Sequence, residues 1–144
     1  MKGSYAIDGG AIYEMATRSD VGGMLREAMK SGDVVAHTHE LAITEVLYLL
    51  CRRIGFDKAK SHVDNLILSG LVDLEPTADL METAGRLKCQ YPIALADCYT
   101  LALAERHHLA ALFRERETEL VREMKRIPFE VVLVFLSDFG SEIT

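Results

Sequence analysis

Several features that would define a class of protein are absent from this chain of 144 residues. No apolar run reaches the roughly 18 residues of a membrane-spanning helix, and no signal-peptide core follows Met1. The three cysteines include no CxxC pair, so neither a disulfide framework nor a zinc knuckle is expected. We therefore expect a soluble, cytoplasmic protein without membrane association, in which the cysteines are small core residues.

Basic residues are also too few for a protein that binds nucleic acid by general charge attraction. The formal net charge is −6 at pH 7, whereas phosphate binding needs clustered Lys and Arg. This balance does not exclude a nuclease, because carboxylates gathered around divalent cations count as negative although the bound ions neutralise them. The Asp8-Gly9-Gly10 segment is neither a dinucleotide fingerprint nor a phosphate loop, since the further glycines and the Lys-Ser/Thr pair are missing.

Hydrophobic residues make up 49% of the chain, enough for one core, and we expect a single domain over residues 1–144. Short apolar segments predict strands at 4–7, 34–36, 71–74, 110–113 and 131–136. Longer amphipathic segments predict helices at 20–31, 40–54, 56–69, after Thr77, and at 93–107 and 114–126. We interpret Asp8-Gly9-Gly10 as a break after the first strand. This alternation predicts the α/β class, with helices on both faces of a parallel sheet.

Most of the 22 acidic residues, Glu123 among them, fall at helix caps or on polar helix faces. Asp8 differs because it stands at the carboxyl end of the first strand, the edge at which open α/β sheets bind ligands. A turn aspartate beside two glycines is the alternative.

Glu45 lies inside the most apolar predicted helix, which we expect to be largely buried. Its neighbours one turn away are apolar, so its carboxylate requires a cation or a hydrogen-bond donor. A buried ion pair with Arg52 or Arg53 is the alternative to a metal ion. Asp97 poses the same problem, because no other charged residue lies between Lys88 and Glu105. It would be an N-cap if its helix began late. A cation shared by all three acids accounts for them together.

Three stretches resemble the PIN-domain family, especially the VapC toxins of bacterial and archaeal toxin–antitoxin pairs. They are residues 5–12 (YAIDGGAI), 41–55 (LAITEVLYLLCRRIG) and 96–104 (ADCYTLALA). The resemblance implies a three-layer α/β/α fold with a central parallel sheet of about four to five strands.

A fourth region departs from the family pattern, in which Thr, one residue and Asp follow the fourth strand. This chain has residues 112–120 (LFRERETEL) there, and Glu117 is the interpreted replacement, with Glu115 and Glu119 as alternatives. Gly10 also stands where the family has Ser or Thr.

The resemblance implies a metal-dependent endoribonuclease that cleaves RNA phosphodiester bonds. Asp8, Glu45, Asp97 and Glu117 would be both its catalytic residues and its ligands for Mg²⁺ or Mn²⁺, which prefer hard oxygen donors. The expected partners are a VapB-type antitoxin and a second copy in a homodimer. A PIN-like RNA- or protein-binding module with weak or lost catalysis is the alternative.

Basic residues beside the site would hold the RNA backbone or pair with Glu115 or Glu119; they are Arg52, Arg53, Arg114 and Arg116.

Three other kinds of site are disfavoured by the sequence. His37 and His39 alternate along an extended segment without further ligands at zinc spacing, so helix-end packing or solvent explains them better. Cys98 lies among apolar residues that raise a thiol pKa, which favours a core cysteine over a nucleophile. A phosphoaspartate enzyme would need a second acid two residues after Asp8, where Gly10 stands.

Overall fold

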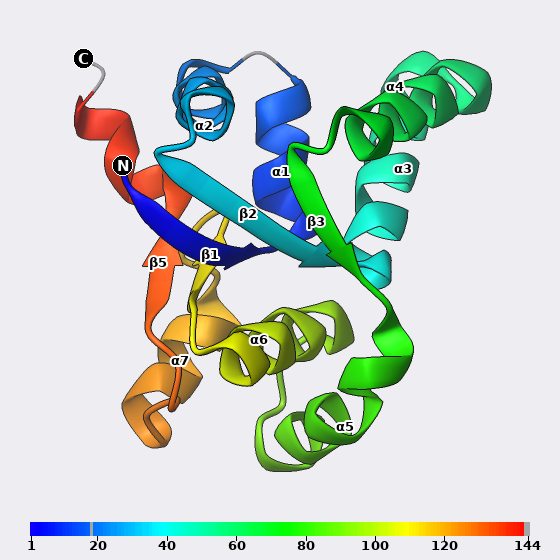
Figure 1. Ribbon diagram of the computed structural model, residues 1–144. Helices are drawn as coiled ribbons and strands as arrows, with labels where there is room; N and C mark the ends of the chain where they lie inside the picture. The colour runs from blue at the N-terminus through cyan, green and yellow to red at the C-terminus, as the bar shows by residue number, and fades with distance from the viewer. Residues whose placement is uncertain (18, 143–144) are drawn as a thin grey trace.

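Five parallel strands form one sheet at the centre of the molecule (Figure 1). The computed structural model describes residues 1–17 and 19–142, so residues 18, 143 and 144 of the predicted domain lie outside the described residues. The strands are β1 (Gly3–Ile7), β2 (Val34–His39), β3 (Val72–Glu75), β4 (Ala110–Phe113) and β5 (Leu133–Phe135). Their order across the sheet is β3-β2-β1-β4-β5, so β1 is central, with β2 on one side and β4 on the other.

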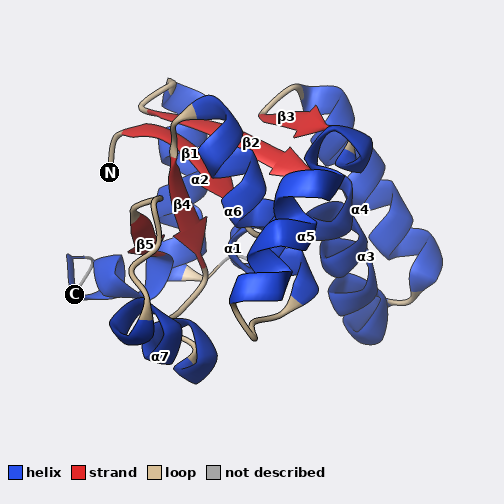
Figure 2. Cartoon of the chain, turned by 90° about the horizontal axis from the view of Figure 1, so that it is seen from below, coloured by secondary structure: helices blue, strands red, loops and turns tan. Residues whose placement is uncertain are grey.

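Helices cover both faces of this sheet. They are α1 (Gly9–Ala16), α2 (Asp20–Ser31), α3 (Glu40–Ile54), α4 (Phe56–Ser69), α5 (Met81–Gln90), α6 (Leu95–His107) and α7 (Thr118–Arg126), with short 3-10 helices η1 (Thr77–Leu80) and η2 (Leu136–Glu142). Figure 1 shows α1 to α4 on one side of the sheet and α5 to α7 on the other, and Figure 2 shows the second group from its outer side. The expected three-layer α/β/α architecture of the PIN type, with a parallel sheet of four to five strands, is confirmed.

Alternating side chains along the strands supply two separate cores. Ala6 and Phe113 pack in the core that includes α5, α6 and α7, whereas Ile7 and Leu112 pack in the core that includes α1 to α4. Each central strand is therefore apolar on both faces, which is the pattern expected of a covered parallel sheet. None of the helices in residues 1–17 and 19–142 is both long and apolar enough to cross a bilayer.

The structure corrects the interpretation of Asp8-Gly9-Gly10 as a break. Helix α1 begins at Gly9, immediately after β1, and Asp8 is its N-cap. The segment was missed because glycine has a low helix propensity. Its glycines have a packing reason instead: a Cβ on Gly9 would overlap Glu45 Oε1 and lie 2.7 Å from the carbonyl oxygen of Ala42.

Three further expectations about burial are wrong in part. Helix α3 is not largely buried: it buries a stripe of Ala42, Val46 and Leu50, and its other residues are half-buried or exposed. Of the cysteines expected in the core, only Cys98 is fully buried, while Cys51 is half-buried and Cys89 is exposed. Glu123 is not on a polar face, since its side chain is only 2% exposed.

Candidate metal and active site

Asp8 lies at the carboxyl end of the central strand. Its N–H donates to the carbonyl of Leu112 at 3.0 Å, which holds it beside the end of β4. Its Oδ1 accepts from the N–H of Ala11 at 2.8 Å, so the residue both ends β1 and caps α1. The chain passes from β1 to β2 on one side and returns to β4 on the other. In open α/β sheets such a reversal point is where ligands bind.

Burial makes the Asp8 carboxyl difficult to ionise. It raises the pKa of Asp8 to about 8, and the charges of Asp97 and Glu45 act in the same direction. The hydrogen bond from Ala11 opposes this shift without cancelling it. Asp8 is therefore a helix N-cap and not the turn aspartate of the alternative, and two remote carboxylates oppose its ionisation.

Glu45 reaches the same edge of the sheet from α3. Burial and the charge of Glu117 raise its pKa, whereas Arg114 is the cation that lowers it most. The expected local ion pair with Arg52 or Arg53 is not formed. Arg52 lies over the ring of Tyr48 at 4.8 Å, and Arg53 donates to the hydroxyl of Tyr13 at 3.2 Å.

Asp97 comes to the edge from the opposite layer. Helix α6 is capped at Ala94, so Asp97 lies inside the first turn and the N-cap alternative is wrong. The residue is 9% exposed. Burial is the main cause that raises the pKa of Asp97, to about 7. The negative charges of Glu117, Glu45 and Glu119 raise it as well, whereas the positive charge of Lys88 lowers it.

Glu117 is the fourth acidic residue, and it is more open than the other three. It stands at the N-cap position of α7. Partial burial is the main cause that raises the pKa of Glu117, and the negative charges of Glu119 and Glu115 raise it further. The charge of Glu117 raises the pKa of both Glu45 and Asp97. The charge of Glu119 raises the pKa of Asp97 but is not among the causes for Glu45. Among the three alternatives of the sequence, Glu117 thus has the strongest interaction with the other acids.

The four residues form a cluster with too little positive charge nearby. We call this cluster of Asp8, Glu45, Asp97 and Glu117 the acidic edge. The cations that lower their pKa values are Arg114, which acts on Glu45 and Glu117, and Lys88, which acts on Asp97. Arg114 also forms an ion pair with Glu14 at 2.6 Å, so its charge is shared. The acidic edge therefore has a surplus of negative charge that a cation would offset.

The donors at the acidic edge suit a hard divalent cation. Carboxylate oxygens are the preferred ligands of Mg²⁺ and Mn²⁺, and their mutual repulsion favours a bound charge of opposite sign. Within the described ranges, however, no group of three or more His, Cys, Asp or Glu side chains has the spacing of a ready metal site. The residues fit the cation by their chemistry and charge, although their spacing is not that of a ready site.

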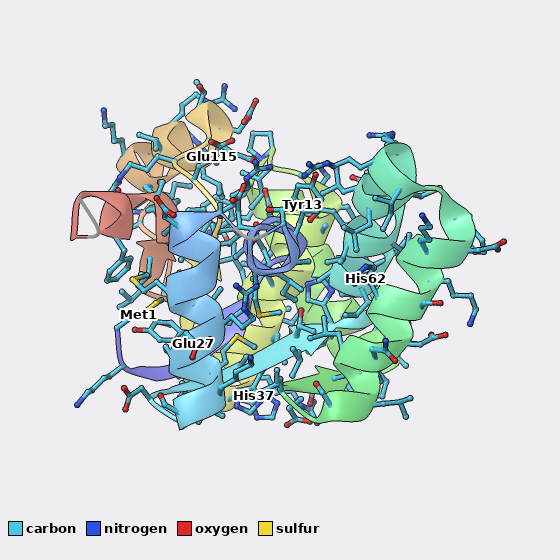
Figure 3. All side chains as sticks on the ribbon, turned by 90° about the horizontal axis from the view of Figure 1, so that it is seen from above. Met1, Tyr13, Glu27, His37, His62 and Glu115 are labelled. Atoms are coloured by element: carbon cyan, nitrogen blue, oxygen red, sulfur yellow. The ribbon has the colours of Figure 1, made fainter. Side chains whose placement is uncertain are left out.

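The remaining basic residues do not pair as expected. Arg114 and Arg116 were candidate partners of Glu115 or Glu119, but Arg114 pairs with Glu14 and Arg116 binds Asp138 through two hydrogen bonds. The contact between Arg114 and Glu14 was missed because it depends on α1. Figure 3 shows Tyr13 of α1 and Glu115 toward one end of the molecule, with His37 toward the other.

Zinc and thiol chemistry find no support in the structure. His37 pairs with Asp73 at 3.2 Å, whereas His39 is buried and caps α3. The prediction of helix-end packing is confirmed for His39. Cys98 is fully buried, which confirms it as a core cysteine, and burial raises the pKa of its thiol to about 11.

Comparisons with known proteins identify the family and the fold of the chain. The family model of the PIN domain matches residues 5–124, and the chain belongs to the PIN domain family. No curated protein gives a significant sequence match. Among solved structures the chain is similar to VapC20 of Mycobacterium tuberculosis, a toxin that cleaves the sarcin-ricin loop. The TM-score is 0.64 at 18% identity, and the match covers 84% of this chain and 95% of that one. This likeness concerns the fold.

Proposed function

We propose that this protein is a metal-dependent endoribonuclease that cleaves RNA phosphodiester bonds at the acidic edge. One observation carries the proposal: four carboxyl groups from four separate segments influence one another electrostatically near the end of β1, and each has its pKa raised in part by other acidic groups. Membership of the PIN domain family and the fold shared with a ribonucleolytic toxin support the same assignment.

The acidic edge would hold Mg²⁺ or Mn²⁺ through Asp8, Glu45 and Asp97, with Glu117 as a direct ligand or one that acts through water. When bound, such an ion acidifies a water for attack on the phosphorus and offsets the negative charge that develops on the phosphate and the leaving oxygen. The protein's own residues have the task of binding the ion, orienting the scissile phosphate and excluding competing cations.

Proton release accompanies binding at this edge. With a pKa of about 8, Asp8 holds its proton over much of the neutral range in the absence of a cation. A carboxyl group must be ionised to act as a ligand, so ion binding displaces that proton and becomes tighter as the pH rises. Arg114, which lies beside Glu45 and Glu117, keeps these two carboxyl groups closer to their ionised form.

The likeness to VapC toxins supports a fuller proposal of biological role. We propose a cytoplasmic toxin that acts as a homodimer and is neutralised by a VapB-type antitoxin. Light scattering of the purified protein tests the homodimer, and co-expression with a candidate VapB-type protein followed by co-purification tests the second association. A monomer that binds no such partner contradicts this role without touching the nuclease proposal.

Cleavage of labelled RNA with and without EDTA tests the activity itself. Wild type should cleave with Mn²⁺ or Mg²⁺, and EDTA or Asp97→Asn should abolish cleavage. The matched control is Asp33→Asn, which changes an exposed aspartate before β2, at the opposite edge of the sheet. It should cleave as wild type does.

A PIN-like binding module without catalysis is the second candidate. The exposed position of Glu117 and the absence of a ready three-residue site in the described chain favour it. RNA that is bound but not cleaved by wild type at any Mn²⁺ concentration would establish this alternative.

A further inference from the structure

Helix α7 carries a shallow hollow that the proposed chemistry does not use. We call it the α7 hollow; its lining residues are Arg116, Thr118, Val121, Arg122, Lys125 and Arg126. All of its charged residues are cationic, although the chain as a whole has a net charge of −6. Four cationic side chains thus gather at this hollow of an acidic protein.

A buried carboxylate fixes the arginines of the hollow. The side chain of Glu123 is only 2% exposed, and it accepts from Arg126 Nε at 2.6 Å and from Arg122 Nε at 3.1 Å. Arg126 also donates through Nη2 to the carbonyl of Gln90 at 2.8 Å. These contacts hold both guanidinium groups in place before any ligand arrives, which reduces the entropy lost on binding.

The hollow keeps a surplus of positive charge after these pairings. Arg122 and Arg126 share the single carboxylate of Glu123, Lys125 forms no ion pair within the described residues, and the charge of Arg116 is met by Asp138. The hydrogen bonds described for Arg122 use only its Nε, so its terminal nitrogens remain available as donors. Guanidinium groups with donors of this kind bind phosphate oxygens well.

The hollow begins beside the acidic edge, because its lining residues Arg116 and Thr118 flank Glu117 in the chain. Helix α7 begins at Thr118, directly after Glu117, and its nine residues extend for about 13 Å away from the edge. That length is nearly four times the roughly 3.4 Å of duplex axis per charge on one strand, so it accommodates more than one phosphate. Val121 is the one large apolar residue of the lining, which does not suit a protein interface with an apolar centre.

We propose that the α7 hollow binds the backbone phosphates of the RNA strand on one side of the bond that is cut. Arg122, Lys125 and Arg126 contact the phosphates, and Glu123 is the positioning residue for the two arginines. The choice of RNA rests on the proposed function, whereas the choice of a phosphate backbone rests on the charges of the hollow.

Salt dependence of binding tests this inference separately from cleavage. The probe is a fluorescent oligoribonucleotide with 2′-O-methyl groups, measured in EDTA at several salt concentrations. Each lost phosphate contact should reduce the slope of log K against log salt by about 0.7. Lys125→Gln and Arg122→Gln should therefore each reduce it by about that amount, and the double variant by about twice as much. Lys58→Gln, which removes an exposed charge on α4, is the matched control and should leave the slope unchanged.

The results distinguish this inference from the proposed function. Unchanged slopes in the double variant would overturn the inference, even if the variant still cleaves RNA with Mn²⁺. An equal loss in Lys58→Gln would also overturn it, because the effect would then be one of general charge. Reduced slopes in a protein that never cleaves RNA would support the hollow while the nuclease proposal fails. An acidic peptide that binds wild type but not the double variant, with RNA binding unchanged, would assign the hollow to a protein partner instead.

Discussion

His39 Nε2 lies 2.9 Å from Thr100 Oγ1, so a single contact joins the start of α3, which carries Glu45, to α6, which carries Asp97. The Nδ1 of His39 accepts from the N–H of Ala42, which leaves the ring proton on Nε2 to be donated to Thr100. Burial lowers the pKa of His39 to about 4, so the ring is neutral at physiological pH. A neutral imidazole thus fixes the spacing of the two helices that bring acids from opposite layers.

We predict that Thr100→Val destabilises the protein by about 1–3 kcal/mol, because it leaves the buried Nε2–H of His39 without an acceptor. Urea unfolding measures the change, and Thr100→Ser, which keeps the hydroxyl, should recover most of it. Thr44→Val on the exposed face of α3 is the control, with an effect within about 0.5 kcal/mol. A wild-type midpoint for Thr100→Val would contradict the role of this hydrogen bond.

Stability of the metal-free protein should fall as the pH rises. The folded-state pKa values of Asp8 and Asp97 are raised to about 8 and about 7, from an ordinary value of 3.8. The folded state therefore favours the protonated forms of both carboxyl groups. Their contribution to the free energy of unfolding is complete below about pH 4 and is lost by about pH 8. Thermal melts in EDTA across this range should show the loss, and Mg²⁺ should restore stability at pH 8.

Asp97→Asn separates this effect from other titrations. The substitution removes a carboxylate whose charge destabilises the folded state at pH 8. It should therefore raise the free energy of unfolding at pH 8 by about 1–3 kcal/mol. The same substitution should abolish cleavage. The gain should shrink toward pH 4. The control Asp33→Asn, at the other edge of the sheet, should change neither stability nor cleavage. If the stability gained by Asp97→Asn were independent of pH, the electrostatic cause would be contradicted.

Gly9→Ala should disturb the acidic edge through packing alone. The added Cβ overlaps Glu45 Oε1 and meets the carbonyl oxygen of Ala42, so α1 and α3 must separate. We expect a loss of about 1–3 kcal/mol in stability, together with weaker cleavage. Gly85→Ala inside α5 is the matched control: its Cβ meets nothing within 4 Å, and the better helix propensity should stabilise the protein by up to about 1 kcal/mol. Equal behaviour of the two variants would contradict the close approach.

The fourth acid can be assigned by comparing three neighbours. Because Glu117 acts on both Glu45 and Asp97, Glu117→Gln should lower kcat/KM for RNA cleavage about 10–100-fold, as does loss of a residue that supports a metal ligand. Glu115→Gln and Glu119→Gln should have smaller effects, measured in the same assay at saturating Mn²⁺. A larger loss in Glu119→Gln would move the assignment to that residue.

Local signals were sufficient to predict much of the fold. Helices α3 and α4 and strand β4 have the bounds that the sequence predicts, because Gly55 and Gly70 end the helices with positive φ and the apolar spacing is clear. Helix α1 was missed because a close contact with Glu45, remote in sequence, overrides the low helix propensity of Gly9 and Gly10.

The acids of the candidate site were easier to predict than their partners. Asp8 stood out because it directly follows the first strand, and Glu45 and Asp97 stood out because an isolated acid in an apolar segment is unusual. The cation near Glu45 is Arg114 and not a neighbour on α3, and the buried position of Glu123 depends on two arginines of its own helix and the packing around them. Such pairings depend on the tertiary structure, which sequence spacing alone does not specify.

The strand order has a consequence for the protein during its synthesis. Strand β1 is made first, yet one of its two neighbours, β4, follows only after α6, and Glu117 follows β4. While translation proceeds, the growing polypeptide presents Asp8 and Glu45 without the residues that complete their surroundings. A nascent polypeptide that ends before Glu117 therefore lacks one of the four acids to which we assign the ion that cuts RNA.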